Sequence, residues 1–232
     1  MKTKNEILEE VANVFKTSWK TRKGIKIPEA EDVKEANDAV KFDGTVLYAD
    51  MRDSTNLVNG YKDWFAAEIY KSYLSAACHI IKNNGGEITA FDGDRVMAVF
   101  IGNSKNTSAA KAALQINFIV KEINTILKSK YTNNSFVLKQ SVGIDTSTLF
   151  VAKTGIRSYN DLVWVGRAAN YAAKLSTLGD ENYSTFITES VYDNLNVSSK
   201  NGGNPARNMW EKTIWNETGI VIYKSTWWWA VE

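Results

Sequence analysis

Residues 87–101, Glu-Ile-Thr-Ala-Phe-Asp-Gly-Asp-Arg-Val-Met-Ala-Val-Phe-Ile, form the stretch that decides the fold. Two apolar runs, Glu87 to Phe91 and Val96 to Ile101, flank the tetrapeptide Asp-Gly-Asp-Arg. Glycine after aspartate favours a tight hairpin turn, and the runs are rich in residues that favour strands. We therefore expect two antiparallel strands joined by a hairpin, with Asp94 near its tip.

The segments on either side of this hairpin alternate between strand and helix patterns. A short apolar run at 44–51 reads as a buried strand that ends in a carboxylate, Asp50. A helical period follows over 61–82 and stops at Asn-Asn-Gly-Gly. After the hairpin we expect a helix over 108–128, and then strands over 137–145 and 148–153 that flank another turn.

The order strand, helix, strand, strand, helix, strand is typical of the split-βαβ, ferredoxin-like arrangement. This predicts an α+β sandwich with a largely antiparallel central sheet flanked by helices. Beyond that core, the sequence predicts a strand at 162–165, a helix at 166–178 and a final aromatic-rich strand at 219–231. A final strand with both faces covered is the interpretation we favour for its run Trp227-Trp-Trp229, ahead of a ligand platform.

Composition and length predict one main domain. Of the 232 residues, 1–41 are expected to form an N-terminal helix and a polar linker, and 42–232 the main domain. The 28 basic and 26 acidic residues are dispersed, so no nucleic-acid-binding footprint is visible. The single cysteine, Cys78, excludes an internal disulfide, and no apolar stretch approaches 18 residues. We expect a cytoplasmic protein with no nucleic-acid or membrane partner.

Asp50 and Asp94 are the first candidate functional residues. In the split-βαβ topology their strands are neighbours, so the two carboxylates are expected to converge at one edge of the sheet. Paired carboxylates suit Mg²⁺ or Mn²⁺, and two such ions can activate a hydroxyl and neutralise phosphates. The residues after Asp50 lead into the long helix, where Asp53, Ser54 and Thr55 are candidates to hold a triphosphate. The alternatives are ordinary turn residues and helix caps.

A second candidate group lies on Gly166-Arg-Ala-Ala-Asn-Tyr-Ala-Ala-Lys-Leu175. Arg167, Asn170 and Lys174 are spaced by three and four residues, so they share one face of the expected helix. The alanines between them allow close approach of another element. The alternative is a solvated face or a helix-packing seam.

With these residues in place, the chain resembles the class III nucleotidyl cyclases over roughly residues 42–188. Tyr48-Ala-Asp-Met-Arg-Asp-Ser-Thr55 is similar to the first metal-aspartate motif of that family, and Phe91-Asp-Gly-Asp-Arg-Val-Met-Ala-Val-Phe100 to the second. Val163-Trp-Val-Gly-Arg-Ala-Ala-Asn-Tyr-Ala-Ala-Lys-Leu175 resembles the transition-state helix. The resemblance makes 42–232 the expected catalytic domain.

The resemblance also implies roles for these residues. Asp50 and Asp94 are expected to hold two divalent ions (Mg²⁺ or Mn²⁺), helped by the Met51 carbonyl. Asn170 is expected to orient the ribose. Family members usually carry arginine where Lys174 stands, so either Lys174 or Arg167 is expected to stabilise the α-phosphate. In the family the two groups come from different subunits, which implies a homodimer with shared active sites.

The substrate expectation rests on departures from the family pattern. The positions that match the purine-reading residues hold Ala90 and Val163, neither of which resembles the adenine or guanine sets. Tyr48 and Arg95 lie close to the two aspartates in sequence and are candidates to read a base instead. In this the chain resembles the pyrimidine cyclases of bacterial anti-phage (Pycsar) systems. For Tyr48 and Arg95 the alternatives are a core aromatic and a solvated hairpin residue.

The resulting expectation is an enzyme that converts UTP or CTP to cyclic UMP or cyclic CMP plus pyrophosphate, whose product a separate cyclic-nucleotide effector reads in anti-phage defence. A conventional adenylate or guanylate cyclase is one alternative. A catalytically silent nucleotide-binding domain is another, since Lys224 is only a weak substitute for the usual phosphate lysine. A ferredoxin-like RNA-binding module is the third, and it would show aromatics where the central strands carry acids.

Overall fold

A computed structural model of the chain describes residues 2–156 and 158–231. The chain divides into two compact units. Unit 1 comprises Met1–Asp43 and Thr148–Gly166, and unit 2 comprises Gly44–Ser147 and Arg167–Glu232. Two long strands, β2 (Asp38–Arg52) and β5 (Lys139–Ile156), contribute residues to both units.

Unit 1 is built around the outer parts of these two strands. β1 (Lys20–Lys23) pairs in parallel with the start of β2, and β6 (Tyr159–Val165) pairs antiparallel with the end of β5. Helix α1 (Lys4–Lys16) begins at a capping box formed by Thr3 and Glu6, and none of its residues is buried. A short 3₁₀ helix, η1 (Ala30–Asp32), completes the unit. The helix expected at the N-terminus is therefore present.

Unit 2 contains the central sheet, whose strand order is β10-β11-β7-β5-β2-β4-β3. The pairs β2–β4, β3–β4, β7–β11 and β10–β11 are antiparallel, and β5–β7 is parallel. The bounds of the strands not yet given are Glu87–Asp92 (β3), Arg95–Phe100 (β4), Thr185–Thr188 (β7), Glu211–Trp215 (β10) and Ile220–Ser225 (β11). The predicted α+β sandwich with a mostly antiparallel sheet is confirmed.

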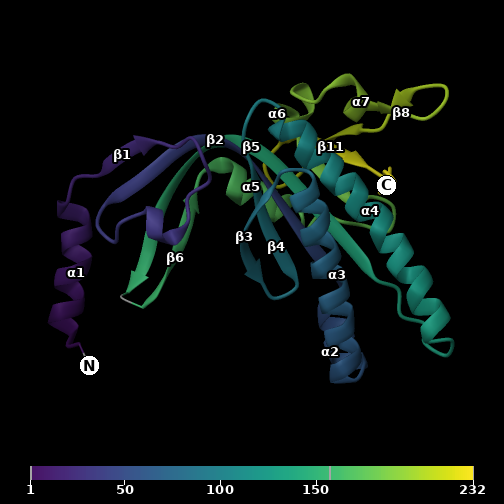
Figure 1. The fold of residues 1–232 in the computed structure, drawn as a ribbon, viewed down its shortest axis with the longest axis horizontal. Helices are drawn as coiled ribbons and strands as arrows, with labels where there is room; N and C mark the ends of the chain where they lie inside the picture. Colours follow the sequence, from purple (N-terminus) through teal and green to yellow (C-terminus); the bar gives the residue numbers. More distant parts are fainter. Residues whose placement is uncertain (1, 157, 232) are drawn as a thin grey trace. The chain divides into compact units, whose positions relative to one another are not determined.

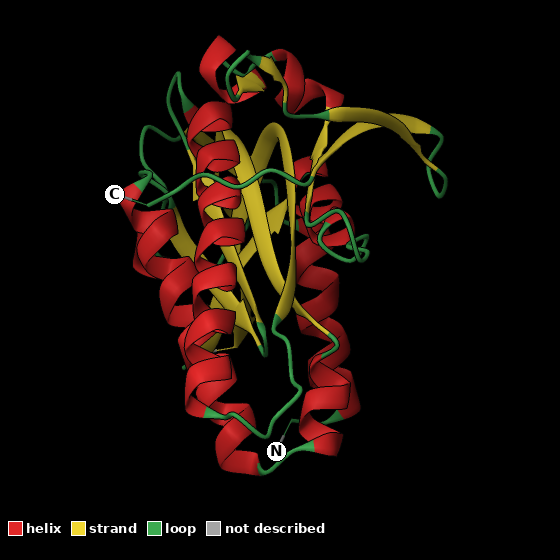
Figure 2. Ribbon diagram, turned by 90° about the vertical axis from the view of Figure 1, so that its right-hand side faces the viewer, coloured by secondary structure: helices red, strands yellow, loops and turns green. Residues whose placement is uncertain are grey.

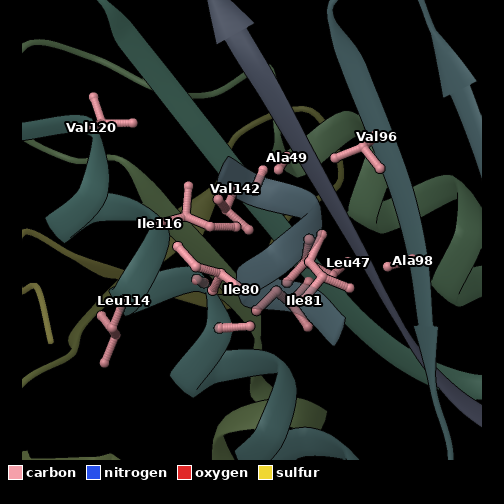
Figure 3. Close-up of a cluster of buried hydrophobic side chains, with 14 of the residues drawn as sticks. Leu47, Ala49, Ile80, Ile81, Val96, Ala98, Leu114, Ile116, Val120 and Val142 are labelled. Atoms are coloured by element: carbon pink, nitrogen blue, oxygen red, sulfur yellow. The ribbon is translucent and has the colours of Figure 1, made fainter. Parts of the chain in front are cut away.

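Two long helices of unit 2, α3 (Asp63–Asn83) and α4 (Lys105–Lys130), lie side by side (Figure 1). Figure 2 shows long helices packed along the strands of the sheet. Ile80 and Ile81 of α3 meet β-strand residues in the core, as Figure 3 shows. From β2 and β4 the buried contributors are Leu47, Ala49, Val96 and Ala98. The face of these strands that bears Leu47 and Ala49 is therefore the helix-covered face.

The shorter elements of unit 2 follow in chain order. The helices are α2 (Ser54–Gly60), α5 (Arg167–Leu175), α6 (Glu189–Asp193) and α7 (Val197–Lys200). A small two-stranded ribbon pairs β8 (Asn201–Gly202) with β9 (Arg207–Asn208). In the part of the chain that the structure describes, no helix is both long and apolar enough to cross a membrane.

Three details of the sequence prediction are wrong. First, the strands expected at 137–145 and 148–153 are one continuous strand, β5, with no turn between them. Asp145 has a fully buried side chain, and its carboxylate accepts hydrogen bonds from Arg167 and Thr188. It therefore makes long-range contacts in place of the local ones that would form a turn. Thr146 and Thr148 are β-branched and favour extended backbone.

Second, the tryptophan run lies outside the last strand, which ends at Ser225. The tail is hydrogen-bonded to α4. The Trp229 N–H donates to the Leu114 carbonyl (3.0 Å), and the Asn117 amide donates to the Trp227 carbonyl (2.8 Å). Third, the segment after Asp50 leads into the separate short helix α2 before α3 begins.

Candidate active site

The end of β2 and the start of β4 bring Asp50 and Asp94 together. Asp50 is the direct cross-strand partner of Arg95, and the Met51 N–H donates to the Asp94 carbonyl at 3.4 Å. Both carboxylates are half-buried, and neither makes a hydrogen bond with any described residue. The convergence expected from the topology is thus present in the fold.

Burial first, and then the negative charge of Asp94, raise the pKa of Asp50 to about 7. Arg95 opposes this shift with its positive charge. Nearby, Tyr73 of α3 is fully buried and its hydroxyl has no hydrogen-bond partner among the described residues. Burial raises the pKa of Tyr73, as do the charges of Asp50 and Asp94. Neither carboxylate forms an ion pair with a described cation, although the Arg95 charge acts on Asp50.

Two unpartnered carboxylates fit a divalent cation of the Mg²⁺ type. Such an ion is bound by one or two carboxylates and completes its shell with phosphate oxygens and water. Among residues 2–156 and 158–231, no group of three or more histidine, cysteine, aspartate or glutamate side chains is placed to hold a metal. A site built by Asp50 and Asp94 alone would therefore depend on the phosphates of a bound nucleotide to complete its ligands.

The predicted phosphate-binding residues lie at the start of α2. Asp53 precedes the helix in the left-handed region (φ 60°) and makes no capping hydrogen bond. The side chains of Ser54 and Thr55 make no hydrogen bond with any described residue either, so helix capping does not account for them. A phosphate-binding role for these three residues stays a prediction.

The sheet face opposite α3 carries the predicted base-reading residues in two rows. One row crosses the sheet as Tyr48, Met97 and Ala90, which are partners in the β2–β4–β3 register. The next row is Asp50, Arg95 and Asp92. Because directly opposed residues in antiparallel strands point to the same side, these side chains share one face. Two members of these rows, Met97 and Asp92, were missed from the sequence.

Asp92 and Met97 were missed for different reasons. The Asp92 carboxylate forms an ion pair with the Arg95 guanidinium, and only the cross-strand register reveals that it belongs beside Asp50. Met97 is an apolar residue in an apolar run, which predicts a core position, and it is indeed buried. The fourth predicted base-reading position, Val163, lies exposed on β6 in unit 1. Its role stays a prediction.

The second candidate group is on α5. Arg167 donates to the buried Asp145 carboxylate (2.9 Å) and to the Thr146 carbonyl (2.8 Å). Lys174 forms an ion pair with Glu217 between two exposed side chains. Asn170 is exposed, and its side chain makes no hydrogen bond with any described residue. Arg167 is therefore committed to the fold. Within the described part of the chain, the Asn170 side chain has no partner and the Lys174 ammonium has only an exposed one.

The alanines of α5 allow it to pack closely on β5. A side chain added at Gly143 of β5 would lie 2.1 Å from the Ala172 carbonyl oxygen, so only glycine fits beneath the helix. Ala168, Ala169 and Ala172 are all buried. The polar residues of α5 consequently project from a helix whose position is fixed by backbone contact.

Known proteins resemble this chain in sequence over its full length. No protein-family model matches the chain. It is 51% identical to a uridylate cyclase of Xanthomonas perforans over 100% of both chains, and 46% identical to a uridylate cyclase of Burkholderia cepacia over 98% of both. A uridylate cyclase of Rhodovulum sp. (strain MB263) is 39% identical, again over 98% of both chains.

Solved structures share the fold at lower identity. The adenylyl cyclase CyaB from P. aeruginosa superposes with a TM-score of 0.69 at 19% identity, over 81% of this chain and 95% of that one. The guanylyl cyclase Cya2 gives 0.67 at 16% identity, over 82% and 94%. The relatives and the fold agree with the motifs at Asp50, Asp94 and α5. The chain therefore belongs to the class III nucleotidyl cyclases, in the group of these uridylate cyclases, and is a nucleotide cyclase.

Proposed function

We propose that the chain converts UTP to 3′,5′-cyclic UMP and pyrophosphate by two-metal catalysis. One arrangement carries the proposal: Asp50 shares its sheet face with Tyr48 and Arg95, while Ala90 occupies the purine-reading place in the same rows. Ala90 has no polar side-chain group to pair with a purine edge. The relatives that match over the full length are uridylate cyclases, which favours UTP over CTP.

The chemistry demands positioning and charge neutralisation. The ribose 3′-oxygen attacks the α-phosphorus, the bond from that phosphorus to the bridging oxygen breaks, and pyrophosphate leaves while the hydroxyl proton passes to solvent. Divalent ions held by Asp50 and Asp94, with the Met51 carbonyl, would lower the hydroxyl pKa and neutralise the phosphates. No side-chain base is then required, which agrees with the exposed position of the single histidine, His79.

Base reading falls to Tyr48 and Arg95. The Tyr48 ring is half-buried two residues before Asp50, and burial raises the pKa of its hydroxyl, so it stays a neutral donor at physiological pH. The Arg95 guanidinium keeps N–H groups beyond the one that Asp92 accepts, and a pyrimidine O2 is a matching acceptor. A site that pairs with O2 discriminates against purines because the paired donors would otherwise be left unsatisfied.

The α5 residues are proposed to act on a partner subunit's nucleotide. In one chain, neither a hydrogen bond nor an ion pair joins described atoms of Asn170 or Lys174 to Asp50 or Asp94. A two-fold homodimer would supply each site with the aspartates of one subunit and with Asn170 and Lys174 of the other. Mixing Asp50→Ala with Asn170→Ala chains should then restore about one working site per heterodimer. A mixture that stays inactive would contradict the shared site.

The direct test is incubation of the purified chain with each of the four nucleoside triphosphates and Mn²⁺ or Mg²⁺, with products identified by mass spectrometry. We expect cyclic UMP to dominate and Asp50→Asn to abolish it. Cyclic CMP as main product would move the proposal to CTP, and cyclic AMP or cyclic GMP would contradict it. No cyclic product from any nucleotide would favour a silent nucleotide-binding domain.

We place this activity in anti-phage defence, where the product would signal to a separate cyclic-nucleotide effector. The support is the resemblance of the Tyr48–Thr55 and Phe91–Phe100 motifs to those of the Pycsar cyclases. Cells that carry the chain should accumulate cyclic UMP after phage infection, and cells that carry Asp50→Asn should not. Equal levels before and after infection would argue against a phage-triggered signal.

A further inference from the structure

Arg95 lies between two carboxylates on the active face of the sheet. In the β2–β4–β3 register, Asp50 is its direct partner on one side and Asp92 its direct partner on the other. All three side chains point to the same face because they are directly opposed in antiparallel strands. Opposed side chains of this kind are close enough to form an ion pair. Arg95 therefore has two acids within reach and one guanidinium to share.

The structure pairs Arg95 with Asp92 only. An Arg95 Nη2 N–H donates to Asp92 Oδ2, and the hydrogen bond raises the pKa of Arg95. The Asp50 carboxylate accepts no hydrogen bond from Arg95 or from any other described residue. The metal-binding carboxylate is thus left open although a cation stands directly across from it.

Fold stability does not explain this pairing. The side chains of Arg95 and Asp92 are 30% and 71% exposed, and ion pairs of that kind contribute about 0–1 kcal/mol. The consequence for Asp50 is larger. A guanidinium paired with both oxygens of a carboxylate occupies the lone pairs that a metal ion needs, and it neutralises the charge that attracts that ion.

We propose that Asp92 is a positioning residue: it holds the Arg95 guanidinium away from Asp50, so that Asp50 stays available to metal and Arg95 is presented to the base. This rests on the proposed function, since it assigns Asp50 to metal and Arg95 to a pyrimidine. Without Asp92, Arg95 turns to its other cross-strand neighbour and competes with the metal ion for Asp50.

Because Arg95 and the metal ion compete for Asp50, the loss of Mn²⁺ affinity in a single variant should be recovered in a double variant. Mn²⁺ binding is measured by calorimetry with saturating α,β-methylene-UTP, whose methylene bridge blocks departure of pyrophosphate. Asp92→Ala should weaken Mn²⁺ binding about 10-fold, the usual scale for a residue that supports a metal ligand. The double variant Asp92→Ala/Arg95→Ala should recover the wild-type Mn²⁺ affinity, because the competing cation is gone. Base selectivity should be lost in both.

A matched control lies on the same strand. Glu87, at the start of β3, forms an exposed ion pair with Lys82 away from the two rows, so Glu87→Ala should leave Mn²⁺ affinity unchanged. Asp92→Asn keeps the side-chain shape and should behave as Asp92→Ala does. Unchanged Mn²⁺ affinity in both Asp92 variants, or a double variant as weak as the single, would overturn the inference. A wild-type chain that fails to bind the analogue would instead contradict the proposed function.

Discussion

The acidic and basic residues of the candidate site differ in how far their side chains are paired within their own chain. The carboxylates of Asp50 and Asp94 make no hydrogen bond with any described residue, whereas the side chains of Arg167 and Lys174 on α5 both pair with carboxylates of the same chain. The two carboxylates are therefore available to bind a cation from outside the chain. The two cations are not equivalent: the partner of Arg167 is fully buried, while that of Lys174 is exposed.

This difference separates two candidates for the transition-state cation. Removing Arg167 from Asp145 would leave a buried charge unpaired, so the guanidinium is tied to the fold. Lys174 gives up only an exposed pair worth about 0–1 kcal/mol when it turns to a phosphate. We therefore assign the α-phosphate role to Lys174 and a structural role to Arg167, and each assignment can be broken by mutation.

The largest effect is expected at the acids. Asp50→Asn keeps the side-chain size but removes a proposed metal ligand, and kcat/KM should fall roughly 10³-fold or more, because metal stabilisation of the transition state amounts to several kcal/mol. The measurement is cyclic nucleotide formation at saturating Mn²⁺. A variant within tenfold of wild type would mean that the unpartnered carboxylate is not a metal ligand.

The same variant should change the pH dependence of stability in the metal-free protein. The pKa of an aspartate in the unfolded chain is about 4, whereas the pKa of Asp50 in the fold is about 7. Between these values the folded chain holds a proton that the unfolded chain has released, so the free energy of unfolding falls as pH rises. Asp50→Asn should remove this fall. Thermal melts of both proteins from pH 4 to 8 check it, and parallel curves would contradict it.

Lys174→Ala should lower kcat about 10²-fold, the usual loss when one transition-state donor is removed, and should leave the melting temperature unchanged. Glu217→Gln is the matched control, because it breaks the same ion pair while keeping the lysine. It should retain activity. If the two variants lose activity equally, the pair itself matters and Lys174 is not the phosphate ligand.

Arg167→Ala should act mainly on stability. Among the described residues, the Asp145 carboxylate would keep only the Thr188 hydroxyl as a side-chain donor, and the loss of hydrogen bonds to a buried charge costs about 2 kcal/mol. Urea unfolding measures this cost. The double variant Arg167→Ala/Asp145→Asn should recover part of it. Full stability with a 10²-fold loss of kcat would reverse the assignments of Arg167 and Lys174.

Local sequence patterns predicted most of the fold, whereas residues joined over long distances were misread. The Asp-Gly turn and the helical period over 61–82 depend on neighbours in sequence, and the hairpin and α3 appear where they were expected. Asp145 was assigned to a strand end before a turn because nothing nearby reveals its ion pair with Arg167. Its burial straightens the chain into one strand, β5.

The candidate site shows the same limit. The convergence of Asp50 and Asp94 followed from strand order, which the sequence predicted. The place of Asp92 beside Arg95 and Asp50 depends on the register of three strands, and a shift of one residue would turn each side chain to the other face. Motif matching therefore identified the aspartates but not the acid that holds Arg95.

The smallest effect is expected at Tyr73, whose hydroxyl is buried beneath the acids without a partner. An unpaired buried hydroxyl costs free energy in the fold, so Tyr73→Phe should leave stability unchanged or raise it by up to about 1 kcal/mol. Tyr70→Phe, on the same helix but only half-buried, is the control. Urea unfolding of the metal-free proteins measures both. A loss of more than about 1 kcal/mol in Tyr73→Phe alone would mean that the hydroxyl is bonded in solution. Tyr73, a buried donor on which the charges of Asp50 and Asp94 act, would then already be engaged, and the acids would be less open than their contrast with α5 requires.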